Sequence, residues 1–266
     1  MPWTLAHPAV VVPLRRVKLF DFAALVIGSM TPDLGYYIRS EISAPAHAFH
    51  GSLIYDLLPG LLLYAAFLLM RKPICFILPT PHREALLRLC ETMRAFSFRD
   101  LPSICISLLL GAWTHILWDR FTHEAGWYVM TTPRLFPVAV AAASARLSSY
   151  VVLEILGSAI GAMILLALYC RWLVRQNVGT RASGSSETWR YFVCASVAVA
   201  SLAGAFALTA HEQPLALRYH LPELFISTFA IDLLTVAAPL LVFVSSAVYF
   251  GQWLSCRHRA PFAVEK

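Results

Sequence analysis

Three stretches of the chain are long and apolar enough to cross a lipid bilayer, and they restrict the fold more than any other feature. Residues 191–210 carry no charge, whereas residues 150–169 and 224–250 each carry one, Glu154 and Asp232. A helix needs about 20 apolar residues to cross the hydrocarbon core. In lipid the backbone must satisfy its own hydrogen bonds, which favours helices. We therefore predict an all-α, polytopic membrane protein.

Two further runs, residues 53–70 and 104–118, bring the number of predicted spans to five. Asp21, Pro32 and Asp33 interrupt the apolar residues 20–38, which could form a sixth span, a re-entrant segment or a helix packed under the other helices. If this segment crossed the membrane, His7 and Asp33 would lie on opposite faces. We expect that it does not cross, and that residues 1–52 form a helical segment packed near one face, against the outer ends of the spans.

Composition and loop charges agree with this interpretation. Of the 266 residues, 59% are hydrophobic and 14% are charged, whereas about a quarter of a soluble domain is charged. The net charge of +6 does not require a nucleic-acid-binding function, because cytoplasmic loops of membrane proteins are rich in Lys and Arg. We expect membrane lipid, and no nucleic acid, as a partner.

The distribution of Lys and Arg predicts the orientation of the chain. Residues 71–100 hold six of them, 171–190 four and 257–266 three, while the opposite loops, 119–149 and 211–223, together hold four. The first three segments, which include the C-terminus, are therefore predicted to be cytoplasmic, in a bacterial inner membrane.

A single membrane domain, residues 1–266, is expected to have two dissimilar halves. Residues 1–149 are rich in His and Asp and contain the candidate metal site. Residues 150–266 consist mainly of the C-terminal transmembrane helices.

The strongest chemical motif lies at the end of the second span. His115, Asp119 and His123 recur every four residues, so on a helix they line one face. Imidazole and carboxylate groups one turn apart can bind the same metal ion. Alternatively, they are interfacial residues at a helix end that form hydrogen bonds with headgroups and water.

Further candidates lie upstream. His7 precedes Pro8, and Asp33 follows a proline turn. His47 and His50, three residues apart, could share a helix face. Each also has a structural interpretation: His7 as a surface residue, Asp33 as a helix cap and His47 as a membrane-interface side chain.

The order of these residues resembles an uncharacterised bacterial integral-membrane family, the domain of unknown function 4184, over most of the chain. The pattern is also similar to inner-membrane metal-dependent hydrolases of the YdjM type. More distantly it resembles zinc-dependent phospholipase C and related single-strand nucleases. By position, the resemblance implies a zinc site formed by His7, Asp33, His50, His115, Asp119 and His123.

The chain departs from the soluble enzymes at a later His-x-x-x-Glu pair, where Glu154 is present but Tyr150 replaces the histidine. We therefore expect one or two zinc ions rather than three. The implied activity is hydrolysis of a phosphoester or lipid-derived substrate, with Asp33 as the catalytic residue that binds metal or orients water.

The alternative is a non-enzymatic membrane protein whose polar residues have a structural or transport role. A transporter would be expected to show repeated halves or matching broken helices, and neither pattern is evident in the sequence.

Overall fold

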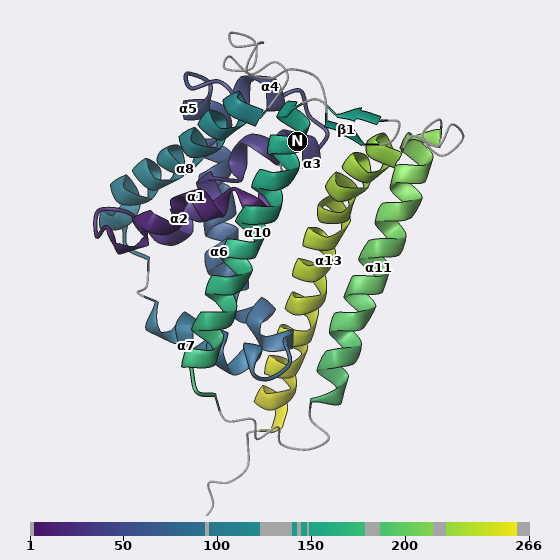
Figure 1. Ribbon diagram of the computed structural model, residues 1–266. Helices are drawn as coiled ribbons and strands as arrows, with labels where there is room; N and C mark the ends of the chain where they lie inside the picture. Colours follow the sequence, from purple (N-terminus) through teal and green to yellow (C-terminus); the bar gives the residue numbers. More distant parts are fainter. Residues whose placement is uncertain are drawn as a thin grey trace, which may run out of the picture. The chain divides into compact units, whose positions relative to one another are not determined.

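The computed structural model describes residues 3–93, 96–122, 140–142, 145–147, 149–178, 187–214 and 222–259. The described chain is helical apart from one short antiparallel hairpin, in which β1 (Val140–Ala142) pairs with β2 (Ala145–Leu147) (Figure 1).

Five helices are long and apolar enough to cross a membrane, and they overlap the five predicted spans. The spanning segments are Ser52–Ile77, Phe98–Thr122, Val152–Arg175, Thr188–Glu212 and Phe225–Ser255. They contain most or all of α6 (Leu57–Ile77), α8 (Leu101–Thr122), α10 (Ser149–Arg175), α11 (Thr188–Glu212) and α13 (Pro222–Arg259). The predicted all-α fold with five spans is confirmed.

Residues 20–38 do not form a sixth span. They form α2 (Phe22–Gly28), the 3₁₀ turn η3 (Thr31–Asp33) and α3 (Leu34–Tyr37). Asp21 caps α2 by accepting a hydrogen bond from the Ala24 amide at 2.8 Å. With seven residues, α2 is far shorter than the roughly 20 that a crossing needs.

The remaining helices are short. They are η1 (Thr4–Ala6), α1 (Pro8–Val11), η2 (Val12–Arg16), α4 (Ser43–Ala46), α5 (Ser52–Tyr55), α7 (His82–Thr92) and η4 (Phe98–Asp100).

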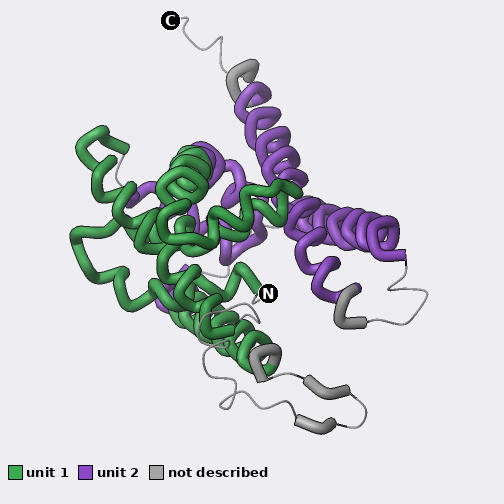
Figure 2. The backbone as a smooth tube through the Cα atoms, turned by 90° about the horizontal axis from the view of Figure 1, so that it is seen from above, with its two compact units in different colours: residues 1–65, 96–171 green, residues 66–95, 172–266 purple. Residues whose placement is uncertain are grey.

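The chain divides into two compact units, which Figure 2 shows in separate colours. The first contains residues 1–65 and 96–171, and the second contains residues 66–95 and 172–266. The third span, α10, thus belongs mostly with the His- and Asp-rich segments.

In the first unit, α2 and α8 cross with their backbones in contact. A Cβ atom added to Gly28 would lie 2.1 Å from the carbonyl oxygen of Leu108, and one added to Gly111 would lie 2.4 Å from that of Leu25. Only glycine permits so close an approach. Since η3 follows directly after α2, this crossing brings Asp33 close to the last turns of α8.

In the second unit, α11 packs along α13. The buried carboxylate of Asp232 on α13 accepts a 2.6 Å hydrogen bond from the Thr209 hydroxyl on α11. This pairing gives the charge predicted within the last span a polar partner from the neighbouring helix.

Candidate metal centre

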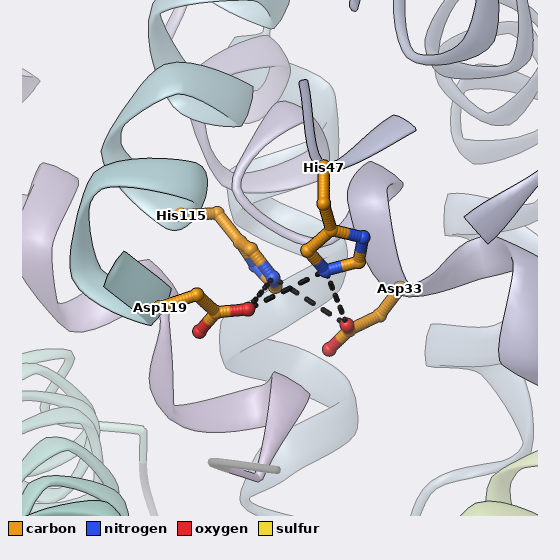
Figure 3. Close-up of side chains that lie close together, drawn as sticks. All are labelled: Asp33, His47, His115 and Asp119. Carbon is orange, nitrogen blue, oxygen red and sulfur yellow. Dashed lines mark ion pairs between the residues drawn. The ribbon is translucent and has the colours of Figure 1, made fainter. Parts of the chain in front are cut away.

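Four side chains from three parts of the first unit converge on one point (Figure 3). His115 and Asp119 lie one turn apart on α8, Asp33 ends η3, and His47 follows α4. Each offers one ligand atom, and these four atoms all lie within 4.8 Å of one another. The group could hold a metal ion.

Four of the six separations between the ligand atoms match a four-coordinate ion, and the other two are within 4.8 Å. His115 Nε2 lies 3.4 Å from Asp33 Oδ1 and 3.2 Å from Asp119 Oδ2. His47 Nε2 lies 3.4 Å from each of the same two oxygens. Four ligands arranged tetrahedrally around zinc, at about 2.0–2.2 Å, are separated from one another by about 3.3–3.6 Å. The four side chains therefore need little movement to bind such an ion.

Backbone carbonyl groups orient both imidazoles. Nδ1 of His115 lies 2.8 Å from the carbonyl oxygen of Ser29, and Nδ1 of His47 lies 2.8 Å from that of Ser43. Because a carbonyl only accepts hydrogen bonds, each Nδ1 is the donor. Each Nε2 is then the ligand nitrogen once its proton is lost, which is the usual arrangement at metal-binding histidines.

Two hydroxyl groups orient Asp33. The Thr4 hydroxyl donates a short hydrogen bond to Asp33 Oδ2, and the Tyr37 hydroxyl donates to Thr4 Oγ1 at 2.5 Å. Burial, assisted by the negative charge of Asp33, raises the pKa of Tyr37 to about 12, so its hydroxyl keeps its proton at neutral pH. With Oδ2 bound in this way, Oδ1 of Asp33 faces the two histidines.

The electrostatics suit a cation. Burial by itself would raise the pKa of the Asp33 carboxyl, but nearby His115 and the hydrogen bonds that Asp33 accepts reverse this effect and hold its pKa well below the usual range. Burial would lower the pKa of His47, yet its contacts with the two carboxylates raise it from 6.5 to about 10. Without metal, protonated imidazole therefore supplies positive charge between the carboxylates.

Three of the six predicted ligands, Asp33, His115 and Asp119, belong to this group of four. His7 adjoins it: the His7 side chain is buried, its ring stacks on His115 with 3.7 Å between centroids, and its Nε2 lies 3.8 Å from Asp119 Oδ1. His123 lies outside the described residues.

The predicted ligand His50 is not in this group of four. His47 takes the place expected for it, and His50 is exposed. The two histidines do not share a helix, because α4 ends at Ala46 and His50 falls in the turn before α5. The spacing of three residues identifies both histidines as candidate ligands but does not favour His47 over His50.

The family described as "Domain of unknown function (DUF4184)" matches residues 1–248, which include all four residues of the centre. No curated protein and no solved structure matches the chain.

Proposed function

The chain belongs to the family of the domain of unknown function 4184, whose description assigns no activity, and we propose from the metal centre that it is a membrane-bound, metal-dependent hydrolase. The observation that carries the proposal is the group Asp33, His47, His115 and Asp119, whose ligand atoms have the spacing of a four-coordinate site.

The donor atoms favour a catalytic ion. Structural zinc sites are usually rich in cysteine, whereas catalytic sites use histidine and carboxylate. Two imidazole nitrogens and two carboxylate oxygens suit zinc. A second ion, if present, would have His7 and Asp119 Oδ1 as its ligands among the described residues.

His47 is the most exposed of the four candidate ligands. Its side chain is 21% exposed, while those of Asp33, His115 and Asp119 are at most 9% exposed. Water would therefore approach on the His47 side, where Asp33 Oδ1 also faces the centre and can orient a water molecule.

We propose hydrolysis of a phosphoester, with a lipid-derived compound as substrate. A bound divalent ion would lower the pKa of a water molecule and offset negative charge on the phosphoester. In the reaction, the water oxygen forms a bond to phosphorus, the bond from phosphorus to the leaving oxygen breaks, and the proton released by water ends on that oxygen. Asp33 would hold the water in position for the attack.

The decisive experiment replaces His115 and Asp119 separately by alanine. Each variant should lose bound metal, measured by elemental analysis, and hydrolysis of bis(p-nitrophenyl) phosphate, while still inserting in the membrane because the apolar spans are untouched. His211→Ala, at an exposed position on α11, is the matched control and should keep both properties. Wild-type protein that binds no metal would exclude the proposal.

A non-enzymatic role for the metal is the second candidate, and one observation favours it. Four protein ligands would fill a tetrahedral site, whereas catalytic zinc keeps a position open for water. On this alternative, chelation would lower the thermal stability of wild-type protein that shows no hydrolysis. On our proposal, one of the four side chains would leave a position for water, and chelation would abolish hydrolysis.

We also propose that the protein lies in a bacterial inner membrane with residues 71–100, 171–190 and the C-terminus on the cytoplasmic side. Loop charge supports this orientation. The last turns of α8, which carry the centre, would then lie towards the outer face. Reporter fusions at Arg88 and at the C-terminus test it, and periplasmic signals from both would reverse the orientation.

A further inference from the structure

An apolar cavity of about 230 Å³ lies in the first unit. Its walls come from four elements: Ala6 of η1, Ala9 and Val10 of α1, Trp118 of α8, and Gly157, Ser158, Ile160, Gly161 and Ile164 of α10. Among the described residues that line it, none is Lys, Arg, Asp or Glu. The walls are thus suited to hydrocarbon.

His7 also lines this cavity and adjoins the metal centre. Its ring stacks on that of His115, with 3.7 Å between centroids, and its Nε2 lies 3.8 Å from Asp119 Oδ1. One imidazole ring is therefore in contact with both the apolar space and the candidate ligands.

Several residues of the cavity wall are exposed on the surface of the protein. Ile160 is 51% exposed, Ile164 43% and Val10 44%. The two isoleucines belong to the candidate span Val152–Arg175. At membrane depth, the molecules next to such a surface are lipids, so a compound that enters here comes from the bilayer.

We propose that this cavity binds a hydrocarbon chain of a membrane lipid, so that the polar part of the same molecule lies beside the metal centre. The volume is below the roughly 300–1,000 Å³ of pockets that hold a whole small molecule, which suits part of one chain. The cavity gives the proposed hydrolase a substrate class, an amphiphile with a phosphoester head. The claim that this head group is hydrolysed rests on the proposed function, whereas the claim that the cavity binds the chain does not.

Photolabelling tests the proposal. The full chain is reconstituted in phosphatidylcholine vesicles that contain a phosphatidylcholine with a diazirine on one acyl chain, and labelled residues are located by mass spectrometry after irradiation. Labelling should concentrate on Ile160, Ile164 and Trp118. Label spread evenly along the exposed apolar side of α10 would overturn the proposal, because ordinary contact with the bilayer would explain it.

Two variants add bulk to the cavity wall from two helices, Ala9→Leu on α1 and Ile160→Trp on α10. The label on Trp118 should fall roughly fifteenfold in each, because excluding two methylene groups removes a factor of about four for each. Met163→Trp is the matched control on α10: Met163 is 61% exposed and is not among the residues that line the cavity. This control should leave the Trp118 label unchanged. Unchanged labelling in both filling variants would contradict the proposal.

Bound metal, measured on the same samples, separates this proposal from the hydrolase. A protein that labels at the cavity but binds no metal would support chain binding and exclude metal-dependent hydrolysis. A protein that binds metal and hydrolyses bis(p-nitrophenyl) phosphate, but whose label is not concentrated in the cavity, would keep the hydrolase and overturn the binding site.

Discussion

Replacing Gly28 by alanine tests whether the crossing of α2 and α8 sets the geometry of the metal centre. The new Cβ would lie 2.1 Å from the Leu108 carbonyl oxygen and 2.8 Å from its carbonyl carbon and Cα. All three are backbone atoms, so no side-chain rotation relieves the contact. Ordinary contact begins near 3.4 Å, so the two backbones would have to separate by about 1.3 Å.

A shift of this size is large for the metal centre. Asp33 follows α2 by a few residues, whereas His115 and Asp119 lie on α8, so the separation acts directly on the distances between ligands. Metal–ligand distances normally stay within about 0.2 Å of their preferred values. The 2.8 Å hydrogen bond from His115 to the Ser29 carbonyl spans the same crossing and would be lost. We expect metal affinity to fall by at least about tenfold, and overpacking to lower the free energy of unfolding by about 1–3 kcal/mol.

The assay is a metal titration of purified protein, together with thermal unfolding of the metal-free form. Gly251→Ala is the matched control, because nothing lies within 4 Å of a Cβ atom at that position on α13. It should bind metal normally and be at least as stable as wild type, since alanine favours helix. Gly60→Ala should be intermediate, because its nearest neighbour is a methyl group of the Leu108 side chain, at 3.0 Å. If Gly28→Ala bound metal as tightly as Gly251→Ala does, the crossing would not control the centre.

Three further predictions concern the ligands and their surroundings. His47→Ala should abolish metal binding and His50→Ala should leave it intact; the opposite result in elemental analysis would restore the ligand expected from sequence. Tyr37→Phe removes the donor to Thr4 and should weaken metal binding about tenfold in titrations without changing the number of ions bound. Metal affinity should rise from pH 6.5 to about 10, because His47 must lose its proton to bind metal. Over the same pH range the metal-free protein should lose stability. The contacts of protonated His47 contribute fully to folding stability below pH 6.5 and are lost as the pH rises through about 10. A melting temperature that rose with pH would contradict this prediction.

The long helices could be predicted from sequence because lipid imposes a simple rule. Each of the five spans overlaps a predicted run, since about 20 apolar residues are needed whatever the neighbours are. The short helices before residue 56 follow no such rule. Their ends depend on single interactions, such as the Asp21 cap of α2, and on contacts between glycine and backbone that spacing does not reveal.

The candidate site was predictable to the extent that it is local. His115 and Asp119 lie four residues apart on one helix, so their proximity depends on helix geometry alone. A proline turn in the sequence predicts that Asp33 is presented to a site, but only the packing of α2 on α8 brings it to the pair. The choice between His47 and His50 depended on where α4 ends, and a change of one turn alters which imidazole faces the centre.

The glycines of the crossing are therefore as informative about metal binding as the ligands themselves. A His-x-x-x-Asp pair on a helix supplies two ligands in any fold, and two are too few for a tight four-coordinate site. The third and fourth ligands must come from other segments at the correct distance. Gly28 and Gly111 allow α2 to touch α8 just before the turn that carries Asp33. This contact brings Asp33 to the pair on α8, so that the pair becomes part of a group of four candidate ligands. A chain with the same histidines and aspartates but larger residues at these two positions should have the motif without the site.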